Sequence, residues 1–219
     1  MGKSKGNAKR IWTCKGCANL EKICYDIKDL GVKYLTVYAF STENWRRSKD
    51  EVDGLMKLFR SYLKKCIKIS RDNKMKIKII GDVSAFAPDI QESIRKLEEF
   101  SKDYDELYFQ IAMNYGSRDE ITRGMKKMAQ DVADGKLSPE DVTEERISGY
   151  LDTAGVPDPD LMIRTSGELR LSNFLMWQMA YTEFYFTDVA WPDFNKAELV
   201  RAIEKYNQRD RRYGGVKEE

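Results

Sequence analysis

The stretch Tyr34-Leu-Thr-Val-Tyr-Ala-Phe-Ser-Thr-Glu-Asn-Trp45 decides the fold prediction. Its first seven residues are mostly β-branched or aromatic, a composition typical of a buried strand. Before it, apolar side chains recur at helical spacing over residues 16–30, and Gly31 ends that predicted helix. After it, residues 50–72 carry a second apolar stripe at the same spacing. A buried strand between two amphipathic helices indicates an α/β protein.

The same alternation continues along the rest of the chain. Further strands are predicted at residues 76–80, 107–113, 161–163 and 184–186, and further helices at 88–102, 118–134, 172–180 and 195–211, with short helices near Ser138 and Thr143. This order predicts one α/β domain over residues 1–219, with a central, mostly parallel sheet and helices on both faces. Ligands of such folds bind at the carboxyl edge of the strands, so the loops that follow the strands are the first candidates for a site.

The composition narrows the function classes. The 38 basic residues nearly balance the 36 acidic ones, so the net charge of +2 gives no reason to expect nucleic acid as a partner. The apolar runs are too short to span a bilayer, and we expect a cytoplasmic protein that could still touch a membrane surface. The chain has no histidine, which excludes Ser-His-Asp and Cys-His catalysis and histidine-ligated metals. Cys14 and Cys17 form a C-x-x-C pair without a second pair, which favours reduced thiols over a zinc site.

Three predicted strand-exit loops carry polar side chains suited to binding. The first, residues 41–47, ends in hydroxyl, amide, indole and guanidinium groups that could hold an anion beside an apolar group; a capped turn is the plainer alternative. In the second, Asn114 or Ser117 could cap the next helix with Glu120, and a helix start also attracts phosphate. In the third, residues 164–173, two arginines and a helix start at Ser172 suit a diphosphate, with a structural Arg–Glu pair as the alternative.

Two further positions are candidates for charged ligands. Glu183 lies in the aromatic run at residues 180–186, where a carboxylate is costly unless it is paired, hydrogen-bonded, bound to a metal or facing solvent. The stretch 211–215 adds two guanidinium groups and two glycines near the C-terminus. Anion-binding loops beside apolar stripes suggest a lipid-like diphosphate as substrate, and the stripe at residues 50–72 could line a channel for its hydrocarbon chain as well as form core.

Taken together, these segments resemble the cis-prenyltransferases, the family that includes undecaprenyl diphosphate synthases. The motifs are YAFSTENW at 38–45, IAMNYGSRDEI at 111–121, IRTSGELRLSNFLMWQMAYTEFYFTDVAWPDF at 163–194 and RRYGG at 211–215. The resemblance covers residues 16 to 215 in order. It implies that isopentenyl diphosphate elongates an allylic diphosphate such as farnesyl diphosphate to a polyprenyl diphosphate of undecaprenyl type, with Mg²⁺ as cofactor.

The resemblance also implies roles for individual residues. Asn44 would orient the substrate or assist proton removal. The allylic substrate would be surrounded by Ser41, Thr42, Glu43, Trp45 and Arg47, and the isopentenyl diphosphate by Arg164, Arg170, Leu171 and Ser172. Glu183 would contribute to Mg²⁺ binding. Arg212 and Gly214 match an R-x-G element that completes the diphosphate site across a homodimer interface.

The departures from the family lie near the start of the chain. The family opens with a strand followed by D-G-N-x-R-W, whose Asp organises Mg²⁺ and diphosphate, and we expect this strand and Asp to be lacking here, which exposes a sheet edge or core face. At the family's G-H-x-x-G, aligned on Gly16, the chain carries Trp12 and Thr13, and Ser48 stands where Pro is common. We therefore expect weak or absent prenyl transfer by this chain alone. The alternatives are a diphosphate-binding partner subunit and a truncated product of a gene for the active enzyme.

Overall fold

A computed structural model describes residues 3–209, with side chains described from residue 15 onward. The chain divides into two compact units, which are treated separately below. One runs from Ile27 to Val156, and the other combines the residues up to Asp26 with those from Pro157 onward. The helix α1 (Lys3–Asp29) passes through the boundary between them.

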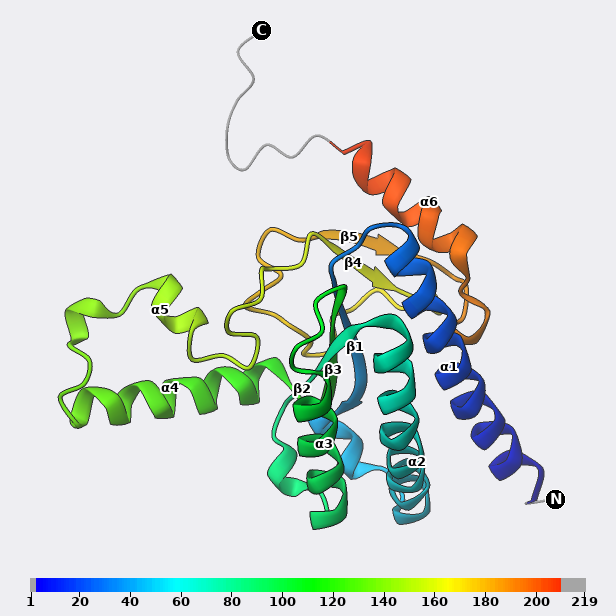
Figure 1. Cartoon of the computed structure of the whole chain (residues 1–219), viewed down its shortest axis with the longest axis horizontal. Helices are drawn as coiled ribbons and strands as arrows, with labels where there is room; N and C mark the ends of the chain where they lie inside the picture. The colour runs from blue at the N-terminus through cyan, green and yellow to red at the C-terminus, as the bar shows by residue number, and fades with distance from the viewer. Residues whose placement is uncertain (1–2, 210–219) are drawn as a thin grey trace, which may run out of the picture. The chain divides into compact units, whose positions relative to one another are not determined.

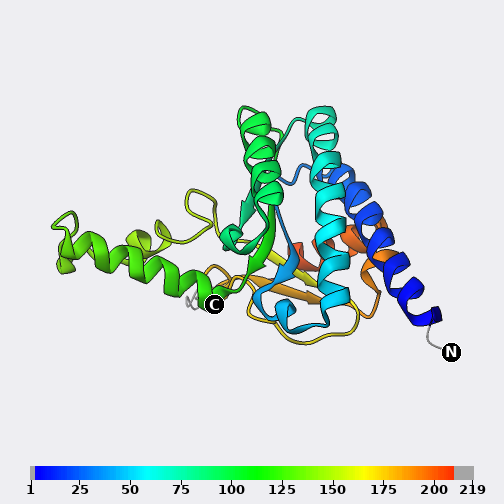
Figure 2. The same cartoon turned by 90° about the horizontal axis from the view of Figure 1, so that it is seen from below.

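The Ile27–Val156 unit is built around three parallel strands in the order β1 (Tyr34–Ser41), β3 (Leu107–Tyr115) and β2 (Met75–Ile80). The central strand β3 is buried along nearly its whole length, which agrees with its apolar sequence. The helices α2 (Lys49–Asn73) and α3 (Pro88–Ser101) lie side by side and pack against β2 (Figures 1 and 2). Their apolar stripes meet the sheet in a core that includes Phe59, Leu63, Ile69, Ile90, Ile94, Leu97, Ile77 and Ile79.

After β3, the chain enters α4 (Ser117–Ala133), and the short helix α5 (Glu144–Ser148) returns beside it (Figure 1). Tyr150 then donates a hydrogen bond to Asp131 of α4 over 2.7 Å. The return brings the segment after α5 back to the start of α4, where Gly124 lies close to the backbone of Tyr150.

The second unit holds the parallel pair β4 (Leu161–Arg164) and β5 (Glu183–Phe186), on which α6 (Lys196–Asn207) packs. Part of α1 joins this unit through Asn19, whose side-chain amide donates to the backbone carbonyls of Trp191 at 2.6 Å and Phe194 at 2.8 Å. In return, the indole of Trp191 donates to the carbonyl of Gly16 at 3.0 Å. Because all three bonds satisfy part-buried or buried polar groups, they fix this part of α1 on the 191–194 turn.

The α/β class and the parallel pairing are confirmed, and the strands form two sheets, one of three strands and one of two. Most predicted elements are found within one or two residues of their expected bounds. Among the described residues, α1 begins at Lys3 rather than at residue 16. The last helix ends at Asn207 rather than 211. No helix in the range 3–209 is long and apolar enough to cross a membrane.

The predicted helix at residues 172–180 is wrong. Ser172, Asn173 and Leu175 have φ angles of 52°, 60° and 42°, in the left-handed region, whereas an α-helix requires φ near −63°. The segment is a series of turns, including a bond from Met179 N–H to Leu175 O of 2.9 Å. Ser172 therefore does not offer the start of a regular helix to an anion.

β2 is an edge strand of the sheet, and the backbone N–H groups that face away from β3 donate to side-chain oxygens. Ile77 N–H donates to Ser101 Oγ at 3.0 Å, Ile79 N–H to Glu98 Oε1 at 2.8 Å, and Gly81 N–H to Asp152 Oδ2 at 3.0 Å. The partners come from α3 and from the segment after α5. Because an open strand edge invites pairing with other chains, this arrangement both holds α3 in place and blocks the edge.

We expect Ser101→Ala to lower the free energy of unfolding by about 1–3 kcal/mol, because it leaves the buried Ile77 N–H without an acceptor. Urea denaturation followed by circular dichroism measures the change. Ser93→Ala is the matched control, since Ser93 makes the same kind of bond to the carbonyl four residues earlier on α3, but that bond is exposed whereas the Ser101 bond is buried. The control should stay within about 0.5 kcal/mol of the parent; equal effects of the two substitutions would show that the β2 edge does not depend on Ser101.

Candidate functional site

The turn after β1 holds most of the residues that the sequence marks for substrate binding. It is a short 3₁₀ helix, Thr42–Arg46, with Ser41 as its N-cap. Ser41 N–H donates to Asn44 Oδ1 at 3.0 Å as one half of a reciprocal capping box. The capped-turn alternative is thus confirmed, and it fixes which way the Asn44 amide faces. A capping role and a substrate-orienting role of Asn44 are compatible, because the bond to Oδ1 also fixes the direction of the Nδ2 group.

Trp45 forms one wall of an aromatic cluster beside this turn. Its ring lies edge-on to Phe40, with centroids 5.1 Å apart, and 5.9 Å from Phe86. Phe40 and Phe86 are buried, whereas 37% of Trp45 is exposed. The indole therefore presents an apolar surface to solvent from a fixed position next to polar groups. Such a surface is suited to the hydrocarbon part of a substrate whose charged part lies on the turn.

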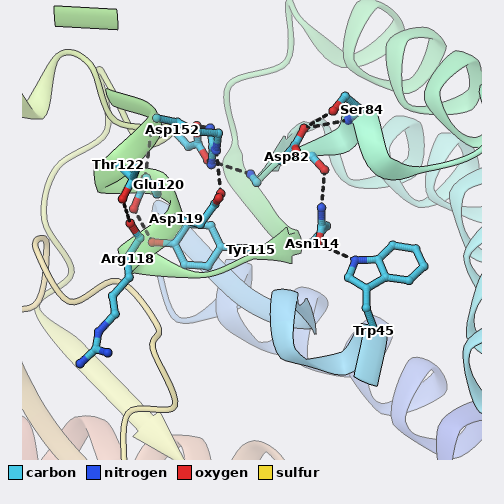
Figure 3. A network of polar contacts seen from close by, with 12 residues as sticks. Trp45, Asp82, Ser84, Asn114, Tyr115, Arg118, Asp119, Glu120, Thr122 and Asp152 are labelled. Carbon is cyan, nitrogen blue, oxygen red and sulfur yellow. Dashed lines mark hydrogen bonds and ion pairs between the residues drawn. The ribbon is translucent and has the colours of Figure 1, made fainter. Parts of the chain in front are cut away.

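Asn114 connects the end of β3 to the two flanking strand ends. Its Oδ1 accepts a bond of 2.7 Å from the Trp45 indole, and its Nδ2 donates to Asp82 O at 2.7 Å (Figure 3). Asp82 N–H donates in turn to Asn114 O at 3.2 Å. The predicted capping of α4 by Asn114 or Ser117 is wrong, since the N-cap of α4 is Gly116 and carries no side-chain bond.

Asp152 anchors the other side of this network. Its carboxylate accepts the Gly81 N–H and forms a bidentate pair with Arg123, at 2.9 and 2.7 Å, while Arg123 also reaches Asp119 at 2.7 Å (Figure 3). The hydrogen bond to Asp152 raises the pKa of Arg123 above its ordinary value. Because two carboxylates face one guanidinium, the positive charge of Arg123 is fully compensated and the cluster keeps an excess of negative charge.

Glu120 joins the network from inside α4 instead of completing a capping box. It is only 1% exposed, accepts a 2.5 Å bond from the Tyr115 hydroxyl, and accepts the Asp152 N–H at 2.9 Å. Burial, followed by the negative charge of Glu120, raises the pKa of Tyr115 above its ordinary value. The phenol therefore stays protonated and keeps donating to the buried carboxylate, which has the partners that a buried charge requires.

Asp152→Ala should lower the free energy of unfolding by about 2–4 kcal/mol, because it removes the acceptor of the Gly81 N–H and the bidentate partner of Arg123. The comparison variant is Asp119→Ala, which removes the more exposed partner of the same guanidinium and should cost about 0–1 kcal/mol. Urea denaturation of both variants decides the question. A cost for Asp119→Ala as large as that for Asp152→Ala would contradict the anchoring role assigned to Asp152.

The loop after β4 carries the arginines of the second unit. Arg164 Nη2 donates to Ser172 Oγ at 3.3 Å, and the exposed Arg170 forms an ion pair with Glu168. The loop is held to the segment after β5 by bonds from Ser166 N–H to Val189 O and from Gly167 N–H to Thr187 O. Gly167 has φ of 68°, and a Cβ there would lie 3.0 Å from Asp188 Oδ1, so a residue with a side chain would be strained at this position. The structural Arg–Glu pair considered for this loop is present.

Glu183 begins β5 and forms an ion pair with Arg209, which also donates to Phe184 O at 3.0 Å. Mg²⁺ is usually held by one or two carboxylates together with substrate phosphates and waters. Among the described side chains, no three Asp, Glu, Cys or His residues come together as a metal cage. Glu183, already paired with an arginine, does not form a ready metal site with its neighbours, and its metal-binding role stays a prediction.

The predicted site residues fall into two groups. Ser41, Thr42, Glu43, Asn44, Trp45 and Arg47 lie together on and beside one turn, and Arg164, Arg170, Leu171, Ser172 and Glu183 lie in the other unit. Arg212 and Gly214 fall outside the described residues. The sequence reasoning missed the link from Asn114 to Trp45 and the anchor at Asp152. The available signal was that β1, β2 and β3 end at one edge, which brings their exit residues together.

The fold and these loops define an α/β protein whose strand-exit turns carry amide, indole and guanidinium groups. Comparison with known proteins narrows the class. A family model described as "Putative undecaprenyl diphosphate synthase" matches residues 2–214. The chain is 49% identical to the isoprenyl transferase of Fusobacterium nucleatum and 46% identical to that of Clostridium perfringens, over 98% of its length and 90% and 85% of theirs.

Solved structures agree with this assignment. Lavandulyl diphosphate synthase from Lavandula x intermedia, in complex with dimethylallyl diphosphate, is 37% identical with a TM-score of 0.88 over 91% of this chain and 86% of that one. A probable undecaprenyl diphosphate synthase from Campylobacter jejuni is 35% identical, with a TM-score of 0.82 over 92% of both chains. The chain belongs to the undecaprenyl diphosphate synthase family of prenyltransferases.

Proposed function

We propose that the protein elongates an allylic diphosphate by condensing it with isopentenyl diphosphate, forming a cis double bond at each step and a polyprenyl diphosphate of undecaprenyl type as product. Family membership supports the reaction class. The observation that carries the proposal for this chain is the turn at residues 42–46, in which the capping box fixes Asn44 and Trp45 presents its exposed ring beside it.

The reaction requires a leaving group, a nucleophile and a proton acceptor. The carbon–oxygen bond of the allylic diphosphate breaks, and diphosphate departs with the bonding electrons. The alkene of isopentenyl diphosphate attacks the allylic carbon. A proton then passes from the adjacent carbon to an oxygen of the departing diphosphate, and the new double bond forms. Guanidinium groups stabilise the charge on the diphosphates, and Asn44 orients the reacting ends or assists loss of the proton.

The proposed division of substrates follows the two groups of residues. The allylic substrate, with farnesyl diphosphate as first candidate, lies against Ser41, Thr42, Glu43, Trp45 and Arg47. The diphosphate of isopentenyl diphosphate is bound by Arg164, Arg170, Leu171 and Ser172. Arg164 and Ser172 support this assignment, since they already lie within hydrogen-bond reach of each other at 3.3 Å.

The proposal has further parts. The cofactor is Mg²⁺, and Arg212 and Gly214 complete the site in a homodimer. The protein is cytoplasmic and briefly contacts a membrane surface. Nucleic acid is not among the proposed partners. Glu183 is paired with Arg209, so metal binding through Glu183 requires that pair to separate. No step of the reaction above depends on Glu183.

Incorporation of radiolabelled isopentenyl diphosphate, with farnesyl diphosphate and Mg²⁺, tests the reaction. The full chain should form labelled polyprenyl diphosphate at the low rate expected from its sequence. Chelation of Mg²⁺ by EDTA should stop incorporation, and Asn44→Ala should lower kcat by about 100-fold or more. Asn207→Ala, an exposed amide at the end of α6, is the control and should leave the rate within about twofold of the parent. Unchanged turnover in Asn44→Ala would contradict the assigned role.

A diphosphate-binding partner subunit without turnover is the second candidate. The observation that favours it is the carboxylate arrangement, since Glu183 is engaged by Arg209. Equilibrium dialysis together with the incorporation assay separates the two candidates, because a partner subunit would bind both diphosphates while showing no incorporation on its own.

The diphosphate role of the second loop is tested by a matched pair of arginines. Arg170 and Arg201 are both exposed and both paired with a nearby glutamate. Arg170→Gln should raise the KM for isopentenyl diphosphate by about 10- to 100-fold through loss of a charge-assisted bond, while Arg201→Gln should leave it unchanged. An equal effect of the two substitutions would indicate a general charge effect and remove Arg170 from the site.

A further inference from the structure

We infer that Asn114 is a positioning residue that holds the Trp45 indole in the orientation needed to contact the allylic substrate. The inference rests on the proposed function, since Trp45 is placed there against the allylic chain. Three bonds carry it: Trp45 Nε1–H donates to Asn114 Oδ1 at 2.7 Å, Asn114 Nδ2 donates to Asp82 O at 2.7 Å, and Asp82 N–H donates to Asn114 O at 3.2 Å (Figure 3). Asn114 is only 5% exposed.

The backbone of β3 is irregular at this residue. Phe40 pairs with Met113 and Ser41 pairs with Tyr115, so Asn114 has no register partner on β1. Its φ angle is 49°, in the left-handed region. An extra residue of this kind forms a bulge, which redirects a side chain at the end of a strand. Here the bulge directs the amide toward the ends of both neighbouring strands.

The chemistry of the position selects asparagine. A left-handed φ is tolerated best by Gly, Asn and Asp. The side chain must also accept from an indole at one end and donate to a carbonyl at the other, which an amide does and an ionised carboxylate cannot. Among these three residues, only asparagine meets both requirements in the buried setting of Asn114.

The partner of Asn114 is itself fixed. Gly81 has φ of 114°, and a Cβ there would lie 2.3 Å from Met113 O, so the backbone after β2 approaches β3 more closely than any other residue allows. Gly81 N–H is held by Asp152, and the Asp82 carboxylate accepts two bonds from Ser84, at 3.0 and 2.6 Å. The Asp82 carbonyl is thus an acceptor held in a fixed position. Hydrogen bonds connect it through Asn114 to the Trp45 indole.

Without Asn114, Trp45 keeps its contacts to Phe40 and Phe86 but loses the bond that sets the rotation of the indole. The half-exposed ring can then turn, and the surface it offers to a hydrocarbon chain is no longer fixed. The effect should fall on the allylic substrate and leave the binding of isopentenyl diphosphate unchanged. This selectivity distinguishes positioning from a general loss of stability.

The test uses three variants of the full chain. Asn114→Gly permits the left-handed backbone and removes the amide, Asn114→Asp retains an acceptor and loses the donor, and Trp45→Phe retains a ring and loses the indole N–H. Lys74→Gly is the control, because Lys74 also has a left-handed φ, 53°, in the same unit and is exposed at the end of α2. Circular dichroism first establishes that each variant is folded.

The first measurement is the indole region of a ¹⁵N–¹H correlation spectrum. The chain has four tryptophans, and the signal lost in Trp45→Phe identifies Trp45. That signal should move upfield in Asn114→Gly, because the indole proton has lost its acceptor, and should stay in place in Lys74→Gly. An unmoved Trp45 signal in Asn114→Gly overturns the inference. If that variant is unfolded, Asn114→Asp provides the reading, with a smaller shift expected.

The second measurement is kinetic. Asn114→Gly should raise the KM for farnesyl diphosphate by about tenfold and leave the KM for isopentenyl diphosphate within about twofold, and adding Trp45→Phe should increase the effect little further. Equal changes for both substrates, or fully additive effects, overturn the inference while leaving the proposed function intact. If the parent shows no incorporation, the Kd for farnesyl diphosphate from equilibrium dialysis replaces KM. A parent that neither turns over nor binds overturns the proposed function, and the inference with it.

Discussion

The position of β3 constrains everything else in the Ile27–Val156 unit. This strand is hydrogen-bonded to a parallel neighbour on each side and is buried along nearly its whole length. Parallel pairing places the ends of β1, β2 and β3 at one edge, so three loops distant in sequence must share that edge. The bulge at Asn114 is tolerated because it falls at the last register positions, after the regular ladder has been formed. The site turn is therefore a consequence of the sheet rather than an independent local structure.

Polar groups at this edge are satisfied by one another. Each buried or half-buried group has a named partner: Glu120 has the Tyr115 hydroxyl and the Asp152 N–H, Asp152 has Arg123, and Asn114 has Trp45 and Asp82. A network of this kind resists rearrangement, because breaking one bond leaves a desolvated group without a partner. The aromatic cluster of Phe40, Trp45 and Phe86 adds apolar contact at the same turn. The two kinds of contact together hold the turn in place.

Sequence patterns predicted the elements well where one face of a helix or strand is buried, as in α2, α3 and β2. They failed at residues 172–180, because the apolar spacing there resembles a helix while the backbone of Ser172, Asn173 and Leu175 is left-handed. They also assigned Asn114 and Glu120 to local capping, whereas both bond to residues more than thirty positions away. Local rules favour the nearest partner, and the parallel sheet supplies a distant one instead. The residues of the first turn were found because hydroxyl, amide and indole groups at a strand exit are themselves a recognisable combination.

Arg170, which we propose binds diphosphate, illustrates how an ion pair can prepare a site without blocking it. Arg170 is exposed and Glu168 is partly exposed, and an ion pair of this kind contributes only about 0–1 kcal/mol. A diphosphate offers more negative charge and several acceptor oxygens, and charge-assisted bonds to a guanidinium are about twice as strong as neutral ones. Exchange of the carboxylate for the diphosphate is therefore favourable, while the carboxylate keeps the guanidinium near its working position. The same reasoning applies less easily to Arg209, whose second bond to the Phe184 carbonyl ties it to the backbone of β5. Release of Glu183 from Arg209 is thus the harder exchange of the two, which makes the guanidinium groups, rather than this carboxylate, the firmer part of the proposed anion site in the second unit.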